Sequence, residues 1–164
     1  MGGTALILID THIWVWWVHG DPQLKAEYVD ALAAAQFTGI AVSILSCWEI
    51  AKLVEYKRLT LTVPTLDWIT MALSYPGVRL LPLTPEIVVD STRLPGTFHK
   101  DPADQMVVAT ARVNGLSLMT LDSKILAYSH VSLVEVWETS NILTHGDIGK
   151  LLPFERERIE LQRT

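Results

Sequence analysis

The sequence predicts an α/β fold, a three-layer α/β/α sandwich built around a mostly parallel central sheet. Short apolar runs rich in β-branched residues recur along the chain, and segments with helical spacing of apolar residues separate them. The apolar runs are continuous rather than alternating, which is typical of strands covered by helices on both faces. Strands that alternate with helices need crossover connections, and crossovers favour parallel pairing.

The predicted elements follow one another in a regular order. Five runs are expected to form strands, at residues 5–9, 40–45, 78–83, 116–121 and 131–136. Five stretches are expected to form helices, at residues 24–36, 48–56, 66–74, 86–94 and 102–113. A further, tryptophan-rich helix is expected directly after Asp10, where it would cover the sheet.

Length and composition limit the class of protein. A chain of 164 residues, 49% of them hydrophobic, has enough apolar side chains for a full core, which argues against disorder. We expect one domain over residues 1–138 and an extension over residues 139–164 that is helical or loosely docked. The alternative for the extension is an arm that contacts a partner.

The apolar start of the chain predicts a core strand rather than a membrane anchor. Asp10 and His12 interrupt the stretch ALILIDTHIWVWW, which is shorter than the roughly 20 apolar residues of a span. No Lys or Arg precedes Lys25, which argues against a signal peptide. A cytoplasmic protein without membrane contact is therefore expected. The single cysteine, Cys47, allows no internal disulfide and is expected to be a small buried filler.

Four acidic residues occupy junctions between predicted elements. Asp10, Glu49 and Asp122 come after predicted strands, and Asp104 lies at the start of the helix expected over residues 102–113. Helix starts attract acids because free backbone N–H groups and the helix dipole favour negative charge. Ser46-x-x-Glu49 has the pattern of a capping box, so for each acid taken singly a capping role stays open.

Taken together, the four acids predict a metal site. The carboxyl ends of parallel strands share one edge of a sheet, so side chains that follow those strands are expected to converge. Clustered carboxylates repel one another unless they take up protons or a cation. Oxygen ligands favour Mg²⁺ or Mn²⁺, and such an ion can activate water for attack on a phosphodiester. The net charge of −5 argues weakly against nucleic-acid binding, although bound cations would restore positive charge at the site.

Four segments resemble, in order, the signature segments of the PIN-domain family, and more narrowly those of VapC-type ribonuclease toxins of bacterial type II toxin–antitoxin systems. The segments are LIDTHIWVWW, VSILSCWEIAKLV, HKDPADQMVVATA and LMTLDSKI. The resemblance runs from about residue 5 to residue 136 and implies a parallel α/β/α fold. It also implies a catalytic, metal-binding site for Mg²⁺ or Mn²⁺ formed by Asp10, Glu49, Asp104 and Asp122.

The same resemblance implies a function and partners. Residues 1–138 would be a PIN-like nuclease domain, a metal-dependent endoribonuclease that hydrolyses RNA. A cognate VapB-like antitoxin would block the acidic cleft, and a homodimer would be the unit. The alternatives are a PIN-fold protein in RNA processing and a non-catalytic protein-binding module. Phosphatases of the haloacid-dehalogenase class also begin with an Asp after the first strand, but Thr11 and His12 stand where they need a second Asp.

Several neighbours of the acids are candidates for supporting roles. Thr11 is expected to bind a carboxylate or a metal-bound water, or to act as a capping hydroxyl. Asp101 is either a fifth acid of the site or the N-cap of the next helix. Lys100 and Lys124 flank the acids and are candidate phosphate contacts. Gln105 stands where similar sequences usually carry a basic residue, so one cation is missing there.

The tryptophans and histidines near Asp10 leave alternatives open. Trp14 and Trp17 are three residues apart, so they share a helix face, and at least one is expected in the core. Trp16 points elsewhere, toward a protein partner or an unpaired RNA base, and a protein contact is favoured. His12 and His99 lie near the predicted site and receive no role.

Overall fold

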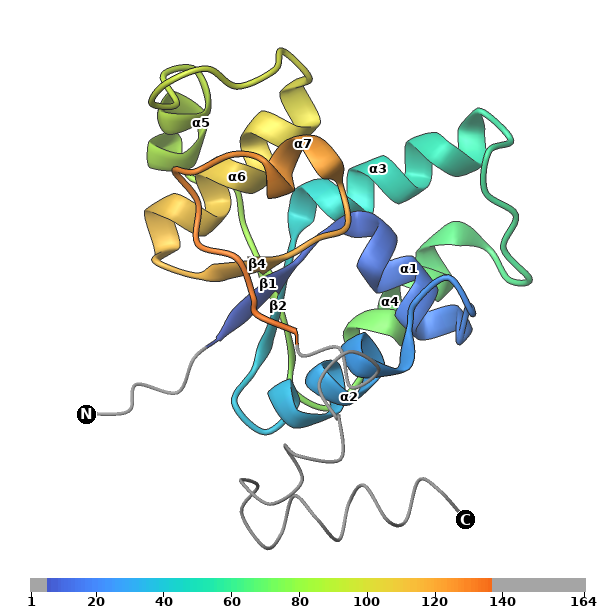
Figure 1. Cartoon of the computed structure of the whole chain (residues 1–164). Helices are drawn as coiled ribbons and strands as arrows, with labels where there is room; N and C mark the ends of the chain where they lie inside the picture. Colours follow the sequence, from blue (N-terminus) through green and yellow to red (C-terminus); the bar gives the residue numbers. More distant parts are fainter. Residues whose placement is uncertain (1–5, 137–164) are drawn as a thin grey trace, which may run out of the picture.

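The computed structural model describes residues 6–136, and these residues contain four strands and seven helices (Figure 1). The elements in chain order are β1 (Ile7–Ile9), α1 (Thr11–His19), α2 (Ala26–Ala35), β2 (Ile40–Ser43), α3 (Ile44–Glu55), α4 (Thr65–Leu73), β3 (Val78–Leu81), α5 (Pro85–Ser91), α6 (Pro102–Asn114), β4 (Ser117–Met119) and α7 (Ser123–Leu126). The predicted C-terminal extension, residues 139–164, lies outside the described residues.

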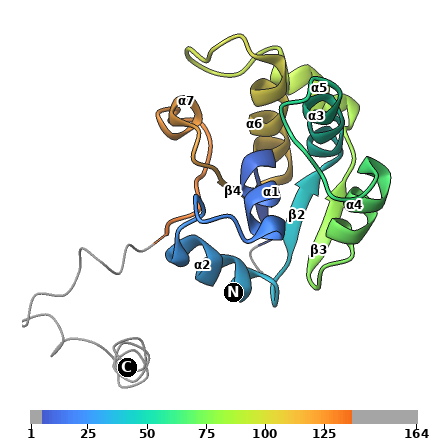
Figure 2. The ribbon, with the colours of Figure 1, turned by 90° about the vertical axis from the view of Figure 1, so that its right-hand side faces the viewer.

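The four strands form one parallel sheet in the order β3-β2-β1-β4, so the first strand lies inside the sheet. Figure 2 shows β3 beside β2. Ile7 pairs with Ile40 of β2 on one side and with Ser117 of β4 on the other. Each pairing is parallel, and the carboxyl ends of β1, β2 and β4 therefore meet at one edge of the sheet.

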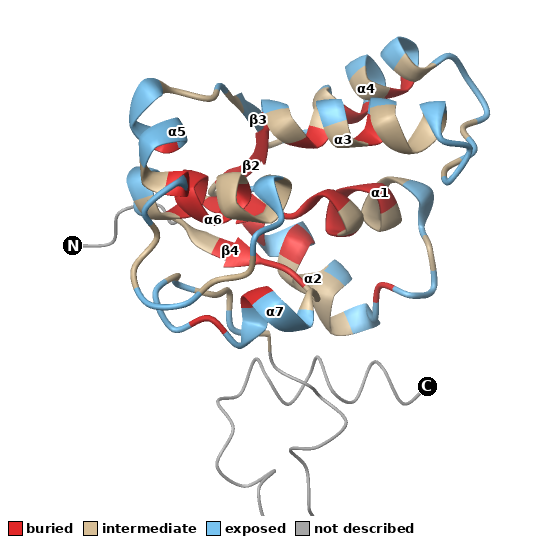
Figure 3. Ribbon diagram, turned by 90° about the horizontal axis from the view of Figure 1, so that it is seen from above, coloured by how far each residue is buried: buried red, intermediate tan, exposed pale blue. Residues whose placement is uncertain are grey.

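Helices cover both faces of the sheet. Ile7 and Ile9 of β1 belong to a core cluster with residues of α1, α2, α3 and α4. The side chain between them, Leu8, belongs to a second cluster with residues of α6 and α7 (Figure 1). Because successive strand residues point to opposite faces, both faces are buried, and buried residues are concentrated in the sheet and the helix sides against it (Figure 3). The predicted three-layer sandwich with a parallel sheet is confirmed.

The core on the first face includes two large aromatic side chains. Trp14 is fully buried, and its ring meets Trp68 of α4 edge-to-face at 5.4 Å between centroids. Trp17 packs its ring against Tyr75 at 5.5 Å. The expectation that at least one of these tryptophans is in the core is confirmed.

The strand predicted over residues 131–136 is wrong. Only Leu133 pairs with the sheet, as a parallel bridge to Leu118. The backbone of Leu118 donates to Ser132 O at 2.8 Å and accepts from Val134 N at 2.9 Å. These two hydrogen bonds flank a single bridge, so residues 131–136 add no further strand to the sheet.

The predicted start of the helix over residues 48–56 is also wrong. The helix α3 begins at Ile44, because the Ser43 hydroxyl accepts from Leu45 N at 3.1 Å and supplies the cap. Ser46 and Glu49 therefore lie inside the helix and form no capping box. Capping does not explain why an acid stands at position 49.

Two further sequence expectations concern Cys47 and the membrane. Cys47 is half-buried against the first core cluster, where burial raises the pKa of its thiol above the ordinary value. A raised pKa lowers the fraction of thiolate at neutral pH, and the thiolate is the reactive form. Among residues 6–136, no helix is long and apolar enough to cross a membrane.

The turn before β3 contains a glycine, Gly77, at a position with no room for a side chain. Gly77 has φ of +81°, and a Cβ added there would lie 2.3 Å from Gln36 O. Gly77→Ala should therefore lower the free energy of unfolding by at least about 2 kcal/mol, measured by urea denaturation. Gly115→Ala is the control, because Gly115 has φ of +63° with nothing within 4 Å of an added Cβ. Equal losses in both variants would show that the contact with Gln36 is unimportant.

Candidate metal and active site

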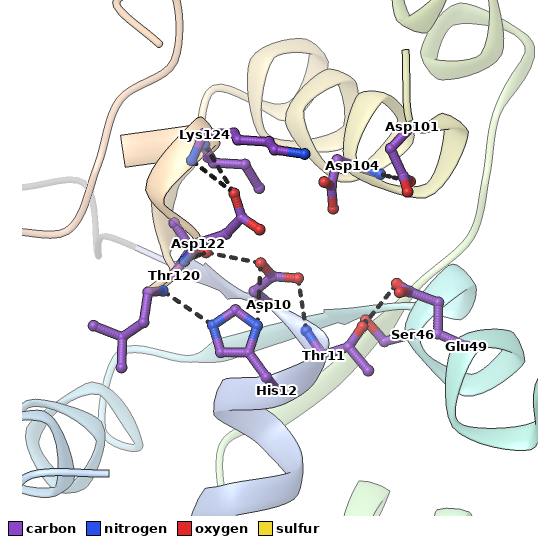
Figure 4. A network of polar contacts seen from close by, with 12 residues as sticks. Asp10, Thr11, His12, Ser46, Glu49, Asp101, Asp104, Thr120, Asp122 and Lys124 are labelled. Carbon is purple, nitrogen blue, oxygen red and sulfur yellow. Dashed lines mark hydrogen bonds and ion pairs between the residues drawn. The ribbon is translucent and has the colours of Figure 1, made fainter. Parts of the chain in front are cut away.

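The four predicted acids border one pocket of about 250 Å³ at the carboxyl edge of the sheet. Asp10 follows β1, Asp122 follows β4, Asp104 lies in the first turn of α6, and Glu49 lies in α3 after β2. Figure 4 shows that these side chains come from four separate segments and face a common space. The predicted convergence of the four acids is what the structure shows.

Asp10 is buried and held by hydrogen bonds on both carboxylate oxygens. Its Oδ1 accepts from the backbone N–H of Thr11 at 2.8 Å, which makes Asp10 the N-cap of α1. Its Oδ2 accepts from the Thr120 hydroxyl at 2.8 Å (Figure 4). Two donors in these positions fix the orientation of the carboxylate before any ligand arrives.

A chain of hydroxyl groups joins α1 to Glu49. Thr11 Oγ1 lies 2.8 Å from Ser46 Oγ and 2.8 Å from Glu49 Oε1 (Figure 4). A hydroxyl carries one hydrogen, so Thr11 donates to the ionised Glu49 carboxylate only if Ser46 in turn donates to Thr11. The Thr11 hydroxyl therefore contacts the Glu49 carboxylate, and Ser46 supports that contact.

Asp104 lies beside a histidine that the sequence analysis left without a role. His99 Nε2 is 3.0 Å from Asp104 Oδ2, yet this buried nitrogen makes no aligned hydrogen bond in the described part of the chain. Ligand atoms of His99, Asp104 and Asp122 all lie within 4.8 Å of one another. Gln105, which stands where a basic residue was expected, donates to the backbone carbonyl of His99 at 3.0 Å and so anchors the segment.

Like Asp10, two further acids near the pocket, Asp122 and Asp101, are helix caps. Asp122 Oδ1 accepts from Lys124 N at 2.9 Å and from Ile125 N at 3.2 Å at the start of α7. Asp101 Oδ1 accepts from Ala103 N at 2.9 Å and from Asp104 N at 3.2 Å, so it caps α6 as predicted. Asp101 is exposed and does not line the pocket.

Glu49 and Asp104, the two pocket acids that cap no helix, have raised pKa values. Burial raises the pKa of Glu49 to about 7, with a smaller contribution from the charges of Asp10 and Asp104, while the Thr11 hydrogen bond lowers it. Burial likewise raises the pKa of Asp104 to about 6, with contributions from Asp101, Asp122 and Asp10, against a lowering by His99. Burial and the neighbouring carboxylates therefore both disfavour the ionised forms of Glu49 and Asp104.

The predicted lysines are less well placed than the acids. Lys100 and Lys124 do not line the pocket, although the Lys124 side chain extends from α7 toward Asp104 (Figure 4). The cation that does line the pocket is Arg58, just after α3, which the sequence analysis missed. Arg58 comes only nine residues after Glu49, but no glycine signals the turn that brings it back to the pocket.

The donor set fits a divalent cation. Four carboxylates supply the oxygen ligands that Mg²⁺ and Mn²⁺ prefer, and no residue lining the pocket except Arg58 carries a fixed positive charge. The buried Nε2 of His99, which lies 3.0 Å from Asp104 Oδ2 without an aligned hydrogen bond, lies where a bound cation would contact it. The second histidine is different, because His12 Nε2 accepts from the backbone N–H of Leu121 at 3.0 Å and is already occupied.

A parallel α/β fold with carboxylates clustered at the carboxyl edge of its sheet defines a class of proteins with acidic sites for cations. Comparison with known families gives the particular member of this class. The model of the PIN domain matches residues 7–131, which is most of the chain. The protein belongs to the PIN-domain family, and the family predicted from the four sequence segments is confirmed.

A curated relative supports the same assignment. Ribonuclease VapC22 of Mycobacterium tuberculosis is 32% identical over 131 residues, which cover 80% of this chain and 98% of that protein. The aligned part therefore includes nearly the whole relative and leaves part of this chain unmatched.

Solved structures show the same fold at lower identity. VapBC2 from Rickettsia felis, bound to a DNA fragment from its promoter, aligns with a TM-score of 0.61 at 14% identity, over 80% of this chain and 99% of that chain. A toxin–antitoxin complex from Klebsiella pneumoniae aligns with a TM-score of 0.57 at 22% identity, over 80% and 98%. FitAcB from Neisseria gonorrhoeae aligns with a TM-score of 0.58 at 19% identity, over 79% and 97%. These similarities concern the fold.

The raised pKa values predict an unusual dependence of stability on pH. Glu49 and Asp104 have ordinary values of 4.5 and 3.8 and folded values of about 7 and about 6, so between these limits the folded state binds more protons than the unfolded chain. In EDTA, the free energy of unfolding should fall as the pH rises from about 4 to about 7, as measured by urea denaturation. Glu49→Gln should flatten the upper part of this decline, and an unchanged slope in that variant would contradict the assignment.

Proposed function

We propose that this protein is an endoribonuclease of the VapC toxin kind, which hydrolyses RNA phosphodiester bonds with Mg²⁺ or Mn²⁺. The observation that carries the proposal is the convergence of Asp10, Glu49, Asp104 and Asp122 at one pocket of a PIN-domain protein. Capping accounts for Asp10 and Asp122, but it accounts for neither Glu49 nor Asp104. The 32% identity to a ribonuclease supports RNA as the substrate.

Each acid has a distinct part in the proposed mechanism. Asp10, Glu49, Asp104 and Asp122 would hold the cation, and His99, whose ligand atom lies within 4.8 Å of those of Asp104 and Asp122, would add a nitrogen donor. When bound, the cation neutralises charge on the scissile phosphate and lowers the pKa of water. Asp10 keeps its orientation through Thr11 N–H and the Thr120 hydroxyl. Glu49 keeps its orientation through its hydrogen bond from the Thr11 hydroxyl.

The proposed partners are an RNA substrate, a VapB-like antitoxin and a second copy of the chain. Exposed apolar residues on α3 support a protein contact there, because Trp48 and Tyr56 are 54% and 64% exposed on the helix that carries Glu49. Proteins similar in fold include one described as a toxin–antitoxin complex. The cytoplasmic location and the domain boundary at residue 138 stay predictions.

Removing one acid should abolish the chemistry without unfolding the protein. Asp10→Asn should lower RNA cleavage by at least about 100-fold in a gel assay with Mg²⁺ or Mn²⁺, because the variant loses a charged ligand. EDTA should stop the wild-type reaction. Asp67→Asn is the matched control, since Asp67 is exposed on α4 and outside the pocket. A folded wild-type protein that cleaves no RNA with either ion would favour the alternative of a protein-binding module.

Metal binding can be measured without activity. Mg²⁺ and Mn²⁺ should raise the Tm of the wild type, and Asp10→Asn with Asp104→Asn should remove that shift. Pulsed EPR of the Mn²⁺-loaded protein should detect a coordinated nitrogen, which His99→Gln should remove. His12→Gln is the control, because His12 Nε2 already accepts a hydrogen bond from Leu121 N. Nitrogen coupling that persists in His99→Gln would exclude His99 as a ligand.

A further inference from the structure

The pocket that contains the acids has a second, chemically different side. Besides the carboxylates it is lined by Val15, Trp16, Leu53, Arg58 and Leu59. One wall is therefore acidic, and the other combines apolar surface, an aromatic ring and a guanidinium. A nucleotide also combines two chemically different parts, because its phosphate is charged and its base presents an apolar π-face.

Trp16 is the tryptophan of α1 that faces this pocket. Trp14 is fully buried, and Trp17 packs against Tyr75, whereas Trp16 is only partly buried at the pocket wall. Trp16 lies one helical turn after His12, and their rings meet edge-to-face at 5.2 Å. His12 Nδ1 in turn lies 3.6 Å from Asp10 Oδ2, so the His12 ring connects the ring of Trp16 to the acidic side of the pocket.

Arg58 reaches the pocket through the turn that ends α3. Lys57 has φ of +56°, a left-handed conformation that glycine usually supplies at this position. Lys57 N donates to Val54 O at 3.0 Å and Arg58 N donates to Leu53 O at 2.8 Å, which is the pair of bonds of a Schellman motif. The turn directs Arg58 and Leu59 back to the pocket that Leu53 already lines.

Arg58 has no competing partner at this wall. Within residues 6–136, no ion pair or side-chain hydrogen bond to Arg58 is present, and its side chain is exposed. A guanidinium in this position binds phosphate oxygens or stacks on a base without first giving up another contact.

We propose that Trp16 and Arg58 form the substrate subsite beside the acids, where Trp16 stacks on an unpaired RNA base and Arg58 contacts the neighbouring phosphate. The proposal rests on the proposed ribonuclease function and narrows it to single-stranded or looped RNA, because paired bases do not expose their faces. The sequence favours a protein contact for Trp16, whereas its place beside the acidic wall favours the base.

The test measures RNA binding and cleavage separately. A labelled single-stranded RNA oligonucleotide is titrated by fluorescence anisotropy with Ca²⁺ in place of Mg²⁺, and cleavage is measured with Mg²⁺. Trp16→Leu should raise Kd and KM about tenfold or more, with kcat changed less than about twofold, and Trp16→Phe should restore most of the binding. Arg58→Gln should weaken binding and reduce the salt dependence by the contribution of about one phosphate.

Matched controls lie elsewhere on the same molecule. Trp17→Leu removes an indole from the same helix outside the pocket, and Arg79→Gln removes an exposed charge from β3. Neither should change Kd. Arg58→Gln keeps the test decisive if Trp16→Leu does not fold, because Arg58 is exposed.

The outcomes separate the two proposals. Wild-type protein that cleaves no RNA overturns the ribonuclease function. Wild-type cleavage together with unchanged Kd and KM in Trp16→Leu and Arg58→Gln overturns only the subsite. Unchanged RNA binding in both variants with loss of antitoxin capture also overturns it, and assigns the wall to the protein partner.

Discussion

Electrostatic repulsion among carboxylates at one edge of a parallel sheet is the constraint to which the rest of the site responds. The topology places the ends of β1, β2 and β4 side by side, and the acids that follow them share a pocket. Backbone and hydroxyl donors hold Asp10, and backbone donors hold Asp122. Glu49 and Asp104 have no such donors from the backbone, and burial, with smaller contributions from the charges of the neighbouring acids, raises their pKa values to about 7 and about 6. A bound cation would offset the negative charge of the four carboxylates.

The same side chains serve the fold and the site. Asp10 and Asp122 start α1 and α7, so the hydrogen bonds that begin these helices also fix two carboxylates of the pocket, while Asp101 caps α6, whose first turn contains Asp104. Ser43 takes the capping role at α3 instead, which leaves Glu49 in the second turn of that helix, in contact with Thr11. Helix capping therefore accounts for Asp10, Asp101 and Asp122. It does not account for Glu49 and Asp104.

Much of this arrangement could be predicted from the sequence, and the failures have physical causes. Continuous apolar runs revealed a sheet buried on both faces, and the positions of Asp10, Glu49, Asp104 and Asp122 after strands or at helix starts revealed their convergence. The run over residues 131–136 has strand composition, but only Leu133 pairs with β4, and composition carries no information about how a segment pairs with its neighbour. Arg58 was missed because its position depends on a left-handed lysine, where sequence patterns signal such turns through glycine.

The turn at Lys57 has a consequence for the helix that precedes it. Glu49 and Arg58 lie nine positions apart along α3 and its terminal turn, and both reach the same pocket. Each residue added to or removed from an α-helix rotates everything beyond it by about 100°. An insertion within α3 after Glu49 would therefore swing the guanidinium away from the carboxylates, even if the hydrophobic contacts of the helix were repaired. The number of residues between Glu49 and Arg58 is therefore fixed by the need for both side chains to reach the pocket. Homologous chains that keep the carboxylate and the guanidinium should keep this spacing unchanged.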